Sequence, residues 1–259
     1  MAIPRTLWML WLQGWDKAPE IVRACAQTWR HHNPGWDIKF LSREDLSDLF
    51  PPASPNHMRV NDPGIPPEFL ADLVRMELLT QYGGVWADAT TYCLRPLDEW
   101  IDAAAASGFF AFDKPGPGRM LSNWFLVSPA DGYVIRKWRS LAEAYWLGRE
   151  AAHIYFWHHT LFGLAYNEDA DIRHVWDMTQ KISAAHPHVM APYQATLFLP
   201  VEQAAHKTAL MKDLPLMKLT HKITYPEDDA GTLYRWLCDS AFDLDKAVGS
   251  GAGALAFSA

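Results

Sequence analysis

The sequence predicts an α/β fold with a mostly parallel sheet flanked by helices, and three observations near the N-terminus support it. Residues 5–12 form a short apolar run, as in a buried central strand. Residues 18–31 follow with apolar side chains at helical spacing, and residues 36–41 then alternate like a second strand. A strand, a helix and a second strand in this order are typical of parallel sheets with crossover helices.

The elements before residue 67 have recognisable boundaries. The first strand closes at Gln13-Gly14, and the first helix stops at Asn33-Pro34-Gly35. A further helix begins at Ser42, whose hydroxyl is a favourable N-cap. Residues 51–66 are rich in proline, which cannot continue a helix or a central strand. We therefore expect a connecting loop over this segment.

The best-defined helix is predicted over residues 67–82. Pro67 stands in its first turn, and Gly83-Gly84 ends it. Residues 85–87, Val-Trp-Ala, are a short strand that leads directly into Asp88. Because α/β folds bind ligands at the carboxyl ends of their strands, we expect Asp88 to be a functional acid.

The second half of the chain has fewer clear patterns. Residues 131–166 are predicted to be mainly helical, and residues 216–220 resemble a strand. Residues 113–120 are irregular, and residues 250–259 are small and apolar, as in a frayed tail. A length of 259 residues with 49% hydrophobic content suits one α/β domain.

Composition bears on several classes of function. Thirty Asp and Glu against 23 Lys and Arg give a formal charge of −7, which opposes binding to the many phosphates of a nucleic acid. The chain holds 13 Trp, 9 Tyr and 12 Phe, which suit stacking on sugars or a nucleobase as well as core packing. No stretch approaches the roughly 20 apolar residues that span a bilayer. The apolar run at residues 7–12 is too short for a secretory signal.

The three cysteines give a further indication of compartment. Cys25, Cys93 and Cys238 are odd in number and widely separated, so they indicate neither a disulfide framework nor a cysteine zinc site. We therefore expect a reducing compartment. The predicted location is the cytoplasm, with at most a peripheral association at the inner membrane.

Three segments carry the strongest functional pattern. They are Ile3-Pro4-Arg5 entering the first strand, Asp72-x-x-Arg75 on the long helix, and Gly83-Gly84-x-x-x-Asp88. In this order and spacing the chain resembles the DXD-type glycosyltransferases of the capsular polysaccharide synthesis protein family, and more distantly the large clostridial glucosylating toxins. The resemblance covers most of residues 3–98. It implies a GT-A type fold, in which a Rossmann-like sheet forms a single catalytic domain.

The resemblance also implies how the chain is divided. We expect one domain over residues 1–249. Residues 1–100 would form a nucleotide-sugar-binding half and residues 101–249 an acceptor-side half, followed by the tail at 250–259.

A metal site follows from the same motif. The family's DXD loop holds Mn²⁺ or Mg²⁺ against the donor diphosphate, and hard divalent cations prefer oxygen ligands such as the Asp88 carboxylate. Thr90 stands where the usual motif has a second acid, so His221 is the candidate to complete the metal shell. The alternatives are a turn aspartate that caps backbone amides, and a solvated loop histidine.

Donor contacts are predicted for Asp72 and Arg75, which lie three residues apart and share a helix face. The resemblance implies that both point into the donor pocket and contact ribose or sugar hydroxyls. From the residues alone, a surface ion pair is the alternative. Trp11 is expected to stack on the nucleobase, with Trp8 or plain core packing as alternatives.

Four further positions complete the predicted donor site, namely Gln13, Gly84, Asn123 and Lys222. Lys222 would balance diphosphate charge beside His221. Asn123 would hydrogen-bond the donor or acceptor sugar.

The predicted reaction moves a hexose from a nucleotide sugar, UDP-linked by preference, to a glycan or lipid-linked acceptor in surface polysaccharide synthesis. Asp88, Asp72 and Arg75 are the predicted catalytic residues, and the resemblance implies retention of anomeric configuration. The non-enzymatic alternative is a sugar- or nucleotide-binding protein that kept the transferase fold but lost the chemistry. Thr90 leaves this alternative open, because it stands in place of an acid of the usual motif.

A metallohydrolase based on histidines is a third possibility. His158-His159 and His186-Pro187-His188 are suggestive of metal ligands. The sequence contains no His-Glu-x-x-His, and adjacent histidines on a helix point in different directions. The pattern therefore favours the transferase.

Overall fold

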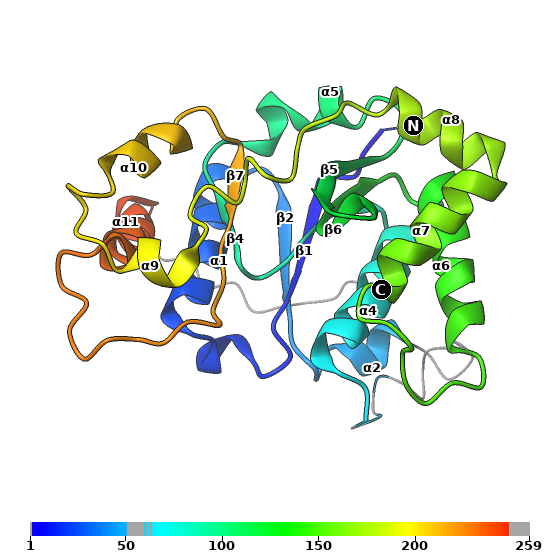
Figure 1. Ribbon diagram of the computed structural model, residues 1–259, viewed down its shortest axis with the longest axis horizontal. Coiled ribbons are helices and arrows are strands. Elements are labelled where there is room, and N and C mark those ends of the chain that lie inside the picture. The colour runs from blue at the N-terminus through cyan, green and yellow to red at the C-terminus, as the bar shows by residue number, and fades with distance from the viewer. Residues whose placement is uncertain (1, 51–59, 61, 63, 249–259) are drawn as a thin grey trace.

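The computed structural model describes residues 2–50, 60, 62 and 64–248. Its main sheet has five strands in the order β2-β1-β3-β6-β5 (Figure 1). These strands are β1 (Thr6–Leu10), β2 (Asp37–Leu41), β3 (Gly84–Ala87), β5 (Phe110–Gly116) and β6 (Arg119–Ser128). The neighbours β2, β1 and β3 are parallel, and β6 is antiparallel to both β3 and β5. All strands except β6 therefore run in one direction, and the predicted mostly parallel α/β sheet is confirmed.

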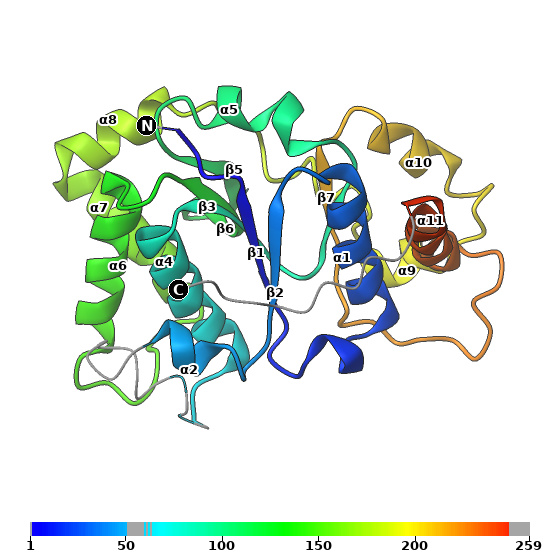
Figure 2. The same cartoon turned by 180° about the vertical axis from the view of Figure 1, so that it is seen from behind.

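Helices cover both faces of this sheet, as Figures 1 and 2 show. The described helices are α1 (Glu20–His32), α2 (Leu46–Leu49), α4 (Pro67–Gln81), α5 (Ile101–Ala104), α6 (Tyr133–Trp146), α7 (Trp157–Glu168), α8 (Ala170–Met178), α9 (Tyr193–Leu197), α10 (Ala205–Met211) and α11 (Leu233–Val248). Short 3-10 turns lie at Trp15–Lys17 and Leu97–Glu99.

The alternation of side chains along β1 divides the core in two. Trp8 and Leu10 pack with α4, α6 and α7 on one face, whereas Leu7 and Met9 pack with α1 on the other. This division explains why the strand is apolar on both sides, because each face is covered by a helix layer. The sheet is therefore a rigid support for the residues at its carboxyl edge.

Several predicted elements lie within one or two residues of the observed ones, notably the long helix predicted at 67–82. The helical region predicted at 131–166 is interrupted, because residues 147–156 connect α6 to α7 without forming a helix. The irregular segment 113–120 lies in the β5–β6 hairpin, at the edge of the sheet, where the ladder slips at Asp113 and Gly116. An edge strand tolerates proline and such irregularities, which is why the pattern is hard to recognise.

A second, two-stranded sheet brings distant parts of the chain together. Strand β4 (Thr91–Cys93) pairs with β7 (Leu216–Lys218) in antiparallel register, with Thr91 opposite Lys218. The main sheet likewise takes β5 and β6 from the predicted acceptor-side half, residues 101–249. Both halves thus contribute to the region around Asp88, and the predicted functional division at residue 100 stays a prediction.

Some expectations fall on residues that the structure does not describe, namely the tail at 250–259 and much of the loop at 51–66. Cys25, Cys93 and Cys238 are buried free thiols. Within the described residues, every helix is too short or too polar to cross a membrane.

Candidate active site

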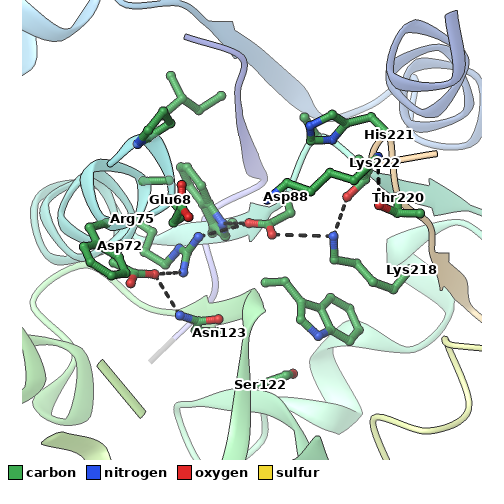
Figure 3. A pocket seen from close by; sticks show the side chains of 18 of the residues that line it. Glu68, Asp72, Arg75, Asp88, Ser122, Asn123, Lys218, Thr220, His221 and Lys222 are labelled. Atoms are coloured by element: carbon green, nitrogen blue, oxygen red, sulfur yellow. Dashed lines mark hydrogen bonds and ion pairs between the residues drawn. The ribbon is translucent and has the colours of Figure 1, made fainter. Parts of the chain in front are cut away.

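A cavity of about 800 Å³ lies at the carboxyl edge of the main sheet. Leu12 after β1 and Ala89 after β3 line it. Its walls include residues of α4, of β6 and of the segment after β7 (Figure 3). Most residues predicted from the sequence line it: Trp11, Gln13, Asp72, Arg75, Asp88, Thr90, Asn123, His221 and Lys222. This size and position suit a small-molecule ligand.

Gly84 is the one predicted donor-binding residue that the cavity does not include. It begins β3, at the opposite end of the strand from Asp88, with φ of +96°. A Cβ at this position would stand 2.3 Å from the carbonyl oxygen of Thr6. The prediction for Gly84 is therefore corrected, because this glycine permits close packing of β3 against the preceding chain.

The Asp88 carboxylate points into the cavity and does not cap its own turn. The turn is closed by the amide of Thr91 and its hydroxyl, which donate to the Asp88 carbonyl oxygen over 2.9 and 2.7 Å. The side chain, 28% exposed, accepts hydrogen bonds at Oδ1 from Trp86 Nε1 at 2.9 Å and Arg75 Nη2 at 3.1 Å. The alternative of a capping turn aspartate is therefore wrong.

Arg75 joins two carboxylates across the cavity wall. Its Nη1 donates to Asp72 Oδ1, its Nη2 donates to Asp88, and its guanidinium lies 5.1 Å from the Trp86 ring centroid. The side chains of Arg75 and Asp72 are only 4% and 10% exposed. The alternative of a surface ion pair is therefore wrong, and the pair is a built part of the cavity.

Asp72 changes charge near neutral pH. Burial raises the pKa of its carboxyl to about 7, with Arg75 opposing this shift and Asp88 adding to it. Asn123 from β6 donates to the same Asp72 oxygen over 2.8 Å. Helix α4 and strands β3 and β6 thus position one connected network of polar groups.

His158 is buried beside Asn123 and contacts this network without lining the cavity. It is not among the donor-site residues predicted from the sequence. Its ring stacks on Trp138 with centroids 4.1 Å apart, and its Nδ1 lies 3.1 Å from Asn123 Nδ2. Burial, helped by the Arg75 charge, holds the pKa of His158 well below its usual range. A neutral imidazole can accept the Asn123 hydrogen bond, so His158 fixes the position of Asn123.

The histidine-based metallohydrolase receives no support from this arrangement. Only His159 of the adjacent pair lines the cavity, whereas His158 is fully buried behind it. Across the residues that the structure describes, there is no group of three or more His, Cys, Asp or Glu side chains placed to hold a metal ion.

Lys218 lines the cavity and is also missing from the predicted set. It ends β7 opposite Thr91, and its side chain is 15% exposed. Its Nζ donates to Thr90 Oγ1 and lies 3.7 Å from Asp88 Oδ2. Burial lowers its pKa, and the neighbouring Asp88 charge opposes that shift. The only signal in the sequence is a lysine within an otherwise apolar strand.

The remaining predicted residues form the wall opposite α4. Trp11 lies edge-on to His221, with ring centroids 5.0 Å apart. Trp8 instead packs in the core and donates its Nε1 to Gly83, so the ring that faces the cavity is Trp11. Lys222 is exposed, and its amide donates to Thr220 Oγ1 over 3.0 Å.

The predicted metal ligands fit a divalent cation poorly. Asp88 Oδ1 already accepts two hydrogen bonds, and Thr90 Oγ1 accepts one from Lys218. Lys218 Nζ donates to Thr90 and lies 3.7 Å from Asp88 Oδ2, so its ammonium would repel a cation held by these two residues. At a separation of about 4 Å and an effective dielectric of about 20, a divalent ion and one unit charge repel each other by roughly 8 kcal/mol. His221 faces Trp11 and adds no carboxylate. The chain therefore offers one carboxylate and one hydroxyl, and most ligands of a Mg²⁺ or Mn²⁺ ion here would have to come from water and the donor diphosphate.

Fold and cavity together define an α/β protein with a charged ligand cavity at the carboxyl edge of its sheet. The chain belongs to the capsular polysaccharide synthesis protein family, whose model matches residues 2–237. Membership in this family confirms the resemblance recognised in the sequence.

Individual relatives carry names of one enzyme class. The chain is 25% identical to the O-glycosyltransferase braB of Annulohypoxylon truncatum, over 56% of this chain and 38% of braB. It is 27% identical to the glycosyltransferase afumC of Aspergillus fumigatus, over 56% of this chain and 41% of afumC. The chain therefore spans about two fifths of the length of these relatives. Among solved structures it is similar to the glycosyltransferase GlyE of Streptococcus pneumoniae, with 12% identity, a TM-score of 0.48, and coverage of 95% of this chain and 62% of GlyE.

Proposed function

We propose that the chain is a glycosyltransferase that moves a hexose from a nucleotide sugar, UDP-linked by preference, to a hydroxyl of a glycan or lipid-linked saccharide. The observation that carries this proposal is the convergence of Asp72, Arg75 and Asp88 on one cavity at the carboxyl edge of the sheet. Family membership and the names of the relatives support the same class of reaction.

The two walls of the cavity suit different parts of a nucleotide sugar. Asp72, Arg75 and Asn123 offer charged and amide groups, which recognise sugar hydroxyls well. The opposite wall carries the cations Lys218 and Lys222, which suit a diphosphate. Beside them Trp11 offers an aromatic ring for a uracil-like base.

The proposed step breaks one bond and forms one. The acceptor hydroxyl oxygen attacks the anomeric carbon, and the bond from that carbon to the diphosphate oxygen breaks. The hydroxyl proton passes to the departing diphosphate on the same face of the sugar, so anomeric configuration is retained without a dedicated base. Asp72 and Arg75 orient the sugar, and the cationic wall stabilises the leaving group.

The acceptor would enter across the aromatic rim of the cavity. Tyr155 and Phe156 are partly exposed there, and the Arg119 guanidinium lies 4.1 Å from the Phe156 ring centroid. Exposed rings of this kind suit stacking on the apolar faces of sugars. We propose that the acceptor belongs to surface polysaccharide synthesis, and that the reaction takes place in the cytoplasm or peripherally at the inner membrane.

The test is a panel of nucleotide sugars, including UDP-glucose and UDP-galactose, applied to the purified chain with and without Mn²⁺. Binding is measured by thermal shift and turnover by release of the free nucleotide. We expect one donor to raise the melting temperature and to be hydrolysed slowly. A donor that binds without any release would favour the binding protein, and a panel with no response would reject the proposed function.

A further inference from the structure

Lys218 is a largely buried cation, with its side chain 15% exposed, and its part in the proposed reaction can be specified further. It comes from β7, far along the chain from the Asp88 turn, and antiparallel pairing with β4 sets it opposite Thr91. Two backbone hydrogen bonds hold this strand end: Lys218 N donates to Pro187 O, and Leu219 N donates to Thr90 O, both over 2.8 Å. The position of the lysine is therefore fixed by backbone pairing on both sides.

The ammonium group contacts the two residues that the DXD pattern assigns to a metal. Its Nζ donates to the hydroxyl of Thr90 and lies 3.7 Å from the carboxylate of Asp88 (Figure 3). Thr90 replaces the second acid of the usual motif, so a neutral hydroxyl faces the lysine where a carboxylate would otherwise bind a cation. The same position thus combines the loss of an acid with the presence of a side-chain cation.

We infer that Lys218 supplies the positive charge that stabilises the departing diphosphate, in the place where Mn²⁺ or Mg²⁺ was predicted. This inference rests on the proposed transferase function. As the bond from the anomeric carbon to the diphosphate oxygen breaks, negative charge grows on that oxygen, and the ammonium attracts it without transferring a proton. Asp88 holds the ammonium in position, and Lys222 on the same wall is a second, exposed cation.

The reaction would then proceed without a divalent ion. The test uses the purified full chain, stripped with EDTA, with UDP and uridine as probes of binding by calorimetry. We expect wild type to bind UDP in EDTA within about threefold of its affinity with Mn²⁺, since the cation is built into the protein. Hydrolysis of the UDP-sugar should persist in EDTA as well.

Variants of Lys218 separate charge from folding. Lys218→Met removes the charge at similar length, and we expect it to weaken UDP binding by about 10–100-fold while leaving uridine affinity nearly unchanged. Lys218→Arg keeps the charge and should restore most of the UDP affinity. The matched control is Lys212→Met, an exposed lysine outside the cavity, which should behave as wild type. Melting temperatures report whether each variant folds.

Three results would overturn the inference, and each has a different meaning. If EDTA abolishes UDP binding and Mn²⁺ restores it equally in wild type and Lys218→Met, a metal carries the charge and only the role of Lys218 is wrong. If wild type binds UDP under neither condition, the UDP-sugar transferase proposal fails and the role of Lys218 fails with it. Equal weakening of UDP and uridine binding in Lys218→Met would assign the lysine a structural role.

Discussion

The two walls of the cavity differ in how the chain builds them. The wall of Asp72, Arg75 and Asp88 comes from one helix and the strand that follows it, so its members lie within a short stretch of sequence. The wall of Lys218 and His221 depends on the pairing of β7 with β4, and the contact from Lys218 to Thr90 spans 128 residues. The first wall is therefore a local motif, whereas the second exists only in the folded protein.

The walls also differ in how deeply their side chains are buried and in how much stability is lost when one of them is removed. Arg75 is nearly inaccessible and pairs with the buried Asp72 and the partly exposed Asp88, so its removal leaves Asp72 without its cationic partner. Lys222 and His221 are far more exposed, so water can take the place of either side chain when it is removed, at little cost in stability. The comparison teaches that substitutions at the buried Asp72 and Arg75 should affect folding and function together, whereas those at the more exposed Asp88 and in the distant wall should affect function first.

The largest effect is expected for Arg75→Ala. The substitution strands Asp72 in a buried site, and we expect the free energy of unfolding to fall by about 3–5 kcal/mol with loss of donor binding. Urea unfolding and calorimetry measure the two effects. Arg95→Ala is the control, because Arg95 forms an exposed helical-spacing pair with Glu99 whose loss should cost less than about 0.5 kcal/mol. Equal, small costs for both variants would contradict the buried network.

Asp88→Asn should reduce turnover of the donor by about 10²–10³-fold while changing the melting temperature little. The carboxylate is the most exposed acid of the network, and an asparagine oxygen can still accept from Trp86. Steady-state kinetics and thermal melts of the same preparations provide the measurement. Activity equal to wild type would remove Asp88 from the mechanism.

The pH dependence of stability tests the burial of Asp72. Because the folded-state pKa of about 7 lies above the ordinary value of 3.8, the folded protein holds this proton more tightly than the unfolded chain. The resulting stabilisation is complete below about pH 4 and is lost as the pH rises through about 7. Relative to Asp72→Asn, wild type should therefore lose at most about 4 kcal/mol between pH 4 and pH 8. Urea unfolding across this range should show the two proteins diverging, and parallel curves would argue against a buried carboxyl.

The smallest effect is expected for Trp11→Ala. The ring faces the cavity beside His221, and its loss should weaken binding of UDP by about 1–3 kcal/mol. Stability should change less than for Trp8→Ala, since Trp8 is packed in the core and Trp11 lies at the edge of the site. Fluorescence titration and thermal melts of both variants distinguish the roles. Unchanged nucleotide affinity in Trp11→Ala would exclude the stacking role.

The sequence by itself determined the fold class and the local wall. Helical spacing over residues 67–82, the glycine pair that ends the helix and the strand before Asp88 are all written in neighbouring residues, so pattern and turn chemistry suffice to predict them. Asp88 was predicted from its place at the end of a strand, whereas Asp72 and Arg75 entered the predicted site through the family resemblance. Their spacing alone left a surface ion pair as the alternative.

Tertiary structure alone decided the rest. The support of Asn123 by His158 and the place of Lys218 beside Thr90 arise from contacts between residues far apart in the chain. Such contacts depend on strand register and on which side chains a fold brings face to face, and neither leaves a periodic signal in the sequence. The role of Gly84 was decided in the same way. Its close approach to the Thr6 backbone depends on how β3 packs against the preceding chain, which the sequence pattern does not show.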